Sequence, residues 1–205
     1  MEAILSQPGW SVRILTKNAA VARDFDLIEK HRDRILVGLS ITAPPDKEDV
    51  ISIIEPNAST ISERMAVMRE AHGRGLRTYA MLCPLLPGIA ESSDQMDEMV
   101  RFAVECACEE IFAEPVNARA TGLKDTQTAI AKTGFAKEAE SLGRIRRKME
   151  WSRYVADLIA NIQRSVRAHH DIRKLRVLLY PSGLRTEDAE RIRRDDAGVV
   201  WLGKK

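Results

Sequence analysis

The chain has 205 residues, of which 44% are hydrophobic and 30% are charged, a composition typical of one soluble globular domain. No apolar run approaches the roughly eighteen residues of a membrane-spanning helix, and the N-terminus, MEAILSQPGW, lacks the basic and apolar parts of a secretory signal. Three cysteines make a poor disulfide framework, so we expect reduced thiols, a cytoplasmic location and no membrane partner.

The net charge of +2 conceals an uneven distribution. Residues 1–118 carry 12 Lys and Arg against 19 Asp and Glu, a net −7, whereas residues 119–205 carry 20 against 11, a net +9. A basic C-terminal part could contact the phosphates of a nucleic acid. A solvated helical surface, or docking of the basic part onto the acidic part, would explain the same asymmetry.

Short apolar runs alternate with amphipathic segments along the chain, which predicts a parallel α/β sheet. Most runs are continuous rather than alternating, as expected of strands that are buried on both faces. In chain order they are VRILT (Val12–Thr16), ILVGLSI (Ile35–Ile41), TYAMLC (Thr78–Cys83), EIFAEP (Glu110–Pro115), RVLLY (Arg176–Tyr180) and VVWL (Val199–Leu202).

Helix-start signals lie between these predicted strands. Thr60–Glu63 has the capping-box pattern, and its helix is predicted to end near Gly73 and Gly75. Ser92–Gln95 offers a second start of the same kind, and Ser152 is predicted to cap a long helix. Residues 116–150 are less regular and indicate a loop with short helices.

Polar residues follow four of the predicted strands, at the edge where parallel α/β proteins bind their ligands. They are Thr16, Lys17 and Asn18; Ser40 and Thr42; Cys83, before the turn Pro84–Gly88; and Glu114, Asn117 and Arg119. A lysine there can hold a carboxylate or phosphate, and hydroxyl, amide and carboxylate groups can bind hydroxyls or amines. The structural alternatives are an ion pair of Lys17 with Asp24 or Glu55, and a helix or turn cap for Ser40.

The common nucleotide-binding and metal motifs are absent. There is no G-x-G-x-x-G and no glycine-rich loop that ends in Lys-Ser/Thr. Cys106 and Cys108 are predicted to be core thiols on a helix, because free cysteines are often buried, whereas Cys83 stands apart at a strand end. His169 and His170 end the long predicted helix, where a cationic ring suits the helix dipole.

The ordered motifs resemble the radical-SAM superfamily, and within it the branch related to spore photoproduct lyase and to DNA-repair photolyase-like proteins. The series is VRILTKNAAVARDFDLI, then ILVGLSIT, then IIEPNASTISERMAVMREAHGRGLRTYAMLCPLLPGI. It covers Val12 to about Asn117, and AEPVNAR, LLYPSGL and GVVWLGK look like the tail of some members. The resemblance implies an α/β fold, a partial (incomplete) TIM-type parallel β/α barrel with helical C-terminal additions. Residues 1–205 would form a single domain, with the family units in 1–117 and a helical insertion and C-terminal strands in 118–205.

Members of this superfamily bind a [4Fe-4S] cluster through a C-x3-C-x2-C motif and cleave S-adenosylmethionine (SAM) to a 5′-deoxyadenosyl radical. The resemblance implies that Lys17 contacts the methionyl carboxylate of SAM and that Ser40 lies near its ribose. It also implies that the Pro84–Gly88 turn, Glu114 and Asn117 line the rim of the cavity. The 205 residues contain no C-x3-C-x2-C, so we expect the C-terminal part of such a protein, without a cluster and without SAM cleavage on this chain alone.

A barrel without its first strands would leave the strand Val12–Thr16 as an open apolar edge, which natural proteins cover or pair. We therefore expect either a homodimer or coverage of this edge by the C-terminal strands. One alternative function is a non-catalytic truncated barrel that binds a ligand, a partner or nucleic acid. Another is an independent α/β enzyme that uses Lys17 or Cys83, although neither has an evident base beside it.

Overall fold

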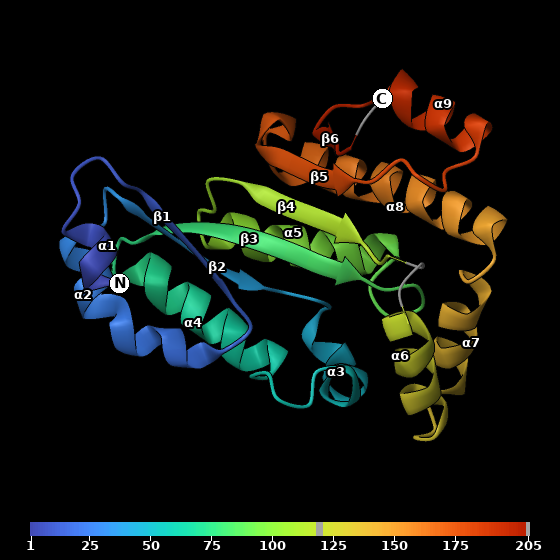
Figure 1. Cartoon of the computed structure of the whole chain (residues 1–205), viewed down its shortest axis with the longest axis horizontal. Coiled ribbons are helices and arrows are strands. Elements are labelled where there is room, and N and C mark those ends of the chain that lie inside the picture. The colour runs from blue at the N-terminus through green and yellow to red at the C-terminus, as the bar shows by residue number, and fades with distance from the viewer. Residues whose placement is uncertain (118–120, 204–205) are drawn as a thin grey trace.

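The computed structural model describes residues 1–117 and 121–203, which form one six-stranded, all-parallel sheet in the order β1-β2-β3-β4-β5-β6 (Figure 1). The strands are β1 (Val12–Thr16), β2 (Ile35–Ser40), β3 (Arg77–Leu85), β4 (Ile111–Pro115), β5 (Leu175–Leu179) and β6 (Val199–Trp201). The six predicted runs are confirmed to within two residues at each end. Each strand pairs with the next one in the chain, and β1 does not pair with β6. The fold is therefore an α/β fold consistent with a partial β/α barrel.

Helices connect the strands. The α-helices are α1 (Glu2–Leu5), α2 (Phe25–Lys30), α3 (Glu48–Ile54), α4 (Ile61–Gly73), α5 (Ser93–Glu105), α6 (Thr121–Ala131), α7 (Ala136–Arg144), α8 (Lys148–His169) and α9 (Thr186–Arg194). Short 3-10 helices are η1 (Ala19–Asp24), η2 (Pro45–Lys47) and η3 (Ile172–Lys174). Within the described parts of the chain, no helix combines the length and the apolar character needed to cross a membrane.

The main core lies between the sheet and a layer of helices, and Figure 1 shows α5 and α8 behind β3, β4 and β5. On the sheet side the core contains alternate strand residues such as Val37, Leu39 and Leu82, each fully buried. The long helix α8 contributes the predicted apolar stripe, Val155, Leu158, Ile159, Ile162 and Val166, and no residue of this stripe is more than 2% exposed. Burial of these side chains is the main source of stability for the sheet-helix pair.

The predicted helix starts are confirmed at two positions and wrong at the third. Capping boxes are present at Thr60, at the start of α4, and at Ser92, at the start of α5. Ser152 does not cap α8, which begins at Lys148. The Ser152 hydroxyl instead donates to Asp188 Oδ2 at 2.5 Å and accepts from the backbone N–H of Arg185 at 2.8 Å. A contact between α8 and the segment before α9 therefore replaces the local capping role.

The second face of the sheet carries a small cluster around Tyr79, whose ring lies over Gly38. A Cβ placed on Gly38 would come within 2.4 Å of Tyr79 Cζ, so no larger residue fits this position without a shift. The Tyr79 hydroxyl donates to the carbonyl of Ile14 at 2.9 Å. The guanidinium of Arg13 lies 4.7 Å from the centroid of the Tyr79 ring and pairs with Glu110 at 2.9 Å. The absence of a side chain at Gly38 on β2 thus lets the Tyr79 ring of β3 cross β2, so that its hydroxyl reaches the Ile14 carbonyl of β1.

The expected coverage of β1 by the C-terminal strands is wrong. Strands β5 and β6 extend the sheet beyond β4, at the edge opposite β1. The reason is that each β/α crossover places its strand beside the preceding one, so the order in space follows the order in sequence. Among the described residues β1 pairs with β2 alone, and Leu15 on β1 is 49% exposed.

Candidate functional site

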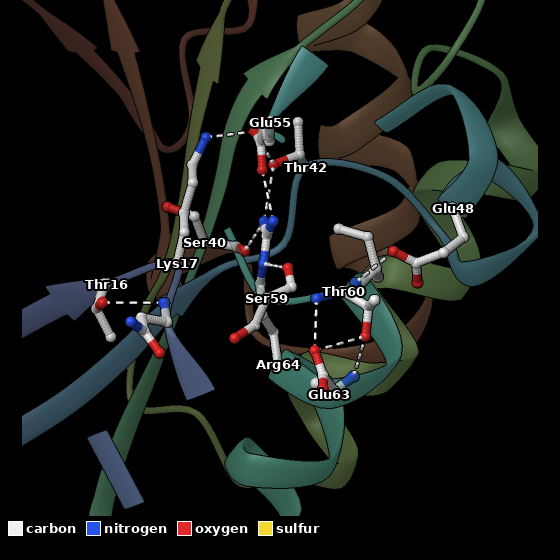
Figure 2. Close-up of polar contacts among 12 residues, drawn as sticks. Thr16, Lys17, Ser40, Thr42, Glu48, Glu55, Ser59, Thr60, Glu63 and Arg64 are labelled. Carbon is white, nitrogen blue, oxygen red and sulfur yellow. Dashed lines mark hydrogen bonds and ion pairs between the residues drawn. The ribbon is translucent and has the colours of Figure 1, made fainter. Parts of the chain in front are cut away.

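The carboxyl ends of β1 to β4 gather the polar residues that the sequence placed after each strand. In Figure 1 the strand arrows point toward the side of the molecule that carries α3, α6 and α7. Glu55, the residue after α3, lies at this edge and joins side chains from several elements (Figure 2). The candidate site is built around its carboxylate.

The Glu55 carboxylate accepts hydrogen bonds from three side chains. Lys17, which follows β1, donates through Nζ to Oε1, and Thr42 donates to the same oxygen at 3.0 Å. Arg64 of α4 donates through Nη2 to Oε2 at 2.6 Å. The Arg64 side chain is 1% exposed and that of Glu55 is 9% exposed, whereas that of Lys17 is 34% exposed. The cluster thus extends from a buried cation to a cation that reaches solvent.

Arg64 is held by the backbone as well as by Glu55. Its Nε donates to the carbonyl of Ser59 at 2.7 Å, and Nη1 donates to the carbonyl of Ser40 at 3.1 Å (Figure 2). A buried guanidinium is tolerated because its donors are matched to acceptors and its charge to a carboxylate. Arg64 therefore fixes Glu55 against the carboxyl end of β2.

The electrostatics of the cluster keep Glu55 ionised. Burial on its own would raise the pKa of this carboxyl, but the hydrogen bonds and charges of Lys17 and Arg64 bring the pKa below its ordinary value. The structure thus contains the Lys17–Glu55 ion pair that the sequence offered as an alternative to ligand binding, and Asp24 instead approaches Arg23 at 3.8 Å. This pair orients the ammonium of Lys17 at the end of β1.

Lys17 also faces an open pocket. The pocket is lined by Thr16, Lys17 and Asn18, which follow β1, and by the segment Glu55–Ala58. An ammonium group has three donors, and the bond to Glu55 uses one of them. A ligand carboxylate or phosphate could therefore contact Lys17 while the pair with Glu55 remains.

Cys83 and Glu114 form a second polar contact at the same edge. Cys83 Sγ donates to Glu114 Oε2 at 3.4 Å. Burial, reinforced by the negative charge of Glu114, raises the pKa of the Cys83 thiol to about 12. A thiol that stays protonated is a poor nucleophile, which counts against an independent enzyme built on Cys83.

The other two cysteines are core residues, as predicted. Cys106 is 1% exposed and Cys108 is 3% exposed, and burial raises the pKa of their thiols to about 11 and about 12. They do not lie together on a helix, however, because α5 ends at Glu105 and Ala107 has a φ of 49°. Among residues 1–117 and 121–203, no group of three or more His, Cys, Asp or Glu side chains could hold a metal ion.

The four predicted cofactor-binding residues fall into two groups. Ser40 is the last residue of β2. Its neighbour Leu39 pairs with Thr16, so Ser40 lies beside Lys17 in the sheet register. The Ser40 hydroxyl forms no hydrogen bond with a described residue. Glu114 and Asn117 line a different pocket, between the ends of β4 and β5. None of the hydrogen bonds among the described residues joins one group to the other. Arg119, the remaining strand-end candidate, lies outside the described residues.

Sequence reasoning missed Arg64, although a signal for it exists. Arg64 lies three residues after Ile61 and four before Met68, both fully buried, so it falls on the apolar face of its helix. A charged residue at such a position needs a buried partner. Trp151 was also missed, because the sequence does not show that its indole N–H reaches the carbonyl of Val116 at 3.0 Å.

Fold and site define the chain as a parallel α/β protein of the partial-barrel type, with a charged cluster at the carboxyl edge of its strands. No family model matches the chain. It is 26% identical over 137 residues to the uncharacterized protein ORF301 of Acidianus two-tailed virus. The matched region covers 64% of this chain and 45% of the viral protein. It is also 24% identical over 96 residues to the uncharacterized protein Rv2578c of Mycobacterium tuberculosis. That matched region covers 47% of this chain and 28% of the mycobacterial protein. The chain therefore spans less than half the length of these curated relatives.

Proposed function

We propose that the chain is the C-terminal portion of a radical-SAM-family protein, of the DNA-repair photolyase-like branch, and that it binds SAM at the carboxyl edge of β1 to β4. The observation that carries this proposal is the placement of Lys17. Lys17 directly follows β1, its side chain is one-third exposed, its ammonium is oriented by Glu55, and it lines an open pocket. Ser40 is its neighbour in the sheet register. A cation in that position suits the carboxylate of a small zwitterionic ligand.

In this proposal each residue has a defined task. Lys17 holds the methionyl carboxylate through a donor that Glu55 leaves available, and the Ser40 hydroxyl bonds the ribose. Glu114 and Asn117 form the rim near the ends of β4 and β5. When bound with the family's cluster, SAM supplies a 5′-deoxyadenosyl radical. The described residues offer no set of cluster ligands, so this chain contributes binding and orientation.

Isothermal calorimetry with SAM tests the proposal. Lys17→Ala removes a charge-assisted hydrogen bond to the ligand and is expected to weaken binding by about tenfold. Lys30→Ala is the matched control, since Lys30 is an exposed lysine at the end of α2, and it is expected to bind SAM as the unaltered chain does. The absence of SAM binding, or an equal loss in both variants, would contradict the proposal.

The alternative is a non-catalytic partial barrel that binds a different ligand, a partner or nucleic acid. The ion pair of Lys17 with Glu55 favours it, because a lysine already paired in the structure needs no ligand to explain its position. A chain that binds no SAM but keeps this ion pair would fit the alternative. A cytoplasmic location and a homodimer that pairs the open edge of β1 belong to both versions of the proposal.

A further inference from the structure

A pocket of about 350 Å³ lies between α8, the end of α7 and the loop that joins β3 to α5. Ligand pockets commonly measure about 300 to 1,000 Å³, so this one has room for a small molecule. It shares no described lining residue with the pocket at Lys17 or with the pocket near the ends of β4 and β5. Figure 1 shows α7 leading into α8 at the end of the molecule away from the N-terminus. The pocket is therefore separate from the candidate site.

Hydrogen bonds and close packing hold the walls of this pocket. Tyr154 of α8 donates at 2.7 Å to the first carbonyl of the segment 85–91, and Asn161 of α8 donates at 3.0 Å to the last. Helix α7 packs against the same segment, since a Cβ placed on Gly88 would lie 2.9 Å from Cβ of Ser141. A pocket whose walls already contact one another loses little freedom when a ligand binds, which favours affinity.

The pocket carries charges of both signs that have no internal partner. Arg144, the last residue of α7, and Arg153 of α8 are exposed, and neither guanidinium bonds a described residue. The half-buried carboxylate of Glu150 likewise has no partner among residues 1–117 and 121–203. Glu91 accepts the N–H of Gly88 at 2.9 Å through Oε1, and its Oε2 bonds none of the described residues. Two cations and two carboxylates thus remain available to a ligand.

The spacing along α8 would allow some of these charges to pair with each other. Arg153 lies three residues after Glu150 and four before Asp157, the separations at which helical ion pairs form. Asp157, which also lines the pocket, is instead bonded by Arg191 of α9 at 2.6 Å. The charges of Arg153 and Glu150 therefore stay open toward the pocket rather than cancelling within the helix.

We propose that this pocket binds a free α-amino acid, with its carboxylate on Arg144 and Arg153 and its ammonium on Glu150 and Glu91. A guanidinium pairs with a carboxylate through two parallel N–H donors, and an ammonium offers three donors to carboxylate oxygens. Because the two cations balance the two carboxylates, a ligand without net charge suits the pocket better than a phosphate or a polyamine, each of which would also meet like charge. The pocket shares no described residue with the site at Lys17, so this binding stands whether or not SAM binds.

Thermal unfolding and calorimetry test the ligand class. Each proteinogenic L-amino acid is added at millimolar concentration, and at least one is expected to raise the Tm, because a ligand of the folded state stabilises it. Calorimetry then compares that amino acid with two analogues, the acid that lacks its amino group and the amine that lacks its carboxylate. Each analogue is expected to bind at least about tenfold more weakly, since one charge-assisted contact is lost. No rise in Tm with any amino acid, or equal binding by either analogue, would overturn the proposal.

Substitutions in the pocket test the site. Arg153→Gln and Glu150→Gln each remove one charge that faces the ligand, and each is expected to weaken amino-acid binding by about tenfold in calorimetry. The matched controls are Arg146→Gln, at the junction of α7 and α8, and Glu140→Gln, on α7. Both residues are exposed and neither lines the pocket, so the controls are expected to bind within about twofold of the unaltered chain. Losses of equal size in the pocket variants and the controls would overturn the proposal.

Discussion

Glu55 connects a buried arginine to a lysine at the edge of the site. Removing its charge leaves Arg64, which is 1% exposed, without the carboxylate that balances it. Glu55→Gln keeps the size of the side chain, so the change isolates the charge. We expect it to lower the free energy of unfolding at neutral pH by about 3 kcal/mol, the usual cost of breaking a buried pair.

The same variant carries a pH signature. The pKa of Glu55 is lowered in the folded protein, so its ionisation contributes stability above the ordinary value of 4.5, and this contribution is lost as the pH falls through the folded pKa. The difference in unfolding free energy between the unaltered chain and Glu55→Gln should therefore be largest near neutrality and shrink in acid. Urea unfolding across pH measures it.

Glu105→Gln is the control, because Glu105 pairs with Arg69 at the surface and is 52% exposed. It should cost less than about 1 kcal/mol at any pH. A pH-independent difference for Glu55→Gln, or one as small as that of the control, would show that the buried cluster does not depend on the charge of Glu55.

Contact between neighbouring strands depends on the glycine of β2. Gly38→Ala would place a Cβ at 2.4 Å from the ring of Tyr79 and displace the hydroxyl that bonds Ile14. We expect a loss of about 2 kcal/mol in unfolding free energy, as for other overpacked interiors. Gly122→Ala lies in α6, where no described atom outside its own stretch of helix comes within 4 Å of the added carbon, and should instead be neutral or stabilising by up to about 1 kcal/mol. Equal stability of the two variants would mean that the Tyr79 ring moves aside without cost.

The elements differ in how far the sequence alone defines them. The six strands were predictable from their apolar runs, but burial on both faces was expected for most of them and holds only for β2 and most of β3. In β1, β4 and β5 more and less buried residues alternate. The start of α8 was not predictable, because Ser152 has the right chemistry for a cap but bonds Asp188, 36 residues away. The sequence offered Asp24 and Glu55 as alternative partners of Lys17. Choosing between them required the fold, which brings Glu55, the residue after α3, to the end of β1. Local patterns define elements well, whereas long-range polar partners depend on the fold.

The charge asymmetry of the whole molecule is only partly neutralised across its two parts. Arg176 pairs with Glu110 at 3.2 Å and so joins the basic part to the acidic one. Other cations of the basic part, such as Arg167 and Arg191, pair with carboxylates of their own part. The excess positive charge is therefore left at the surface, for example on the exposed residues Arg144, Arg146, Arg147 and Lys148.

Strand β1 has one edge that no described strand pairs, and this edge bears on how the protein assembles. Val12 bonds the carbonyl of Arg34, so in a parallel ladder Arg13 and Leu15 direct their backbone groups away from β2. We expect this edge to pair with a second copy, giving twice the chain mass in light scattering. Leu15→Lys places a charge on the exposed edge and should shift the mass toward the monomer, because charged edges resist strand pairing. Tyr180→Lys, at a residue that is similarly exposed beyond β5, should leave the dimer intact. A monomeric mass for the unaltered chain at all concentrations would contradict the expectation.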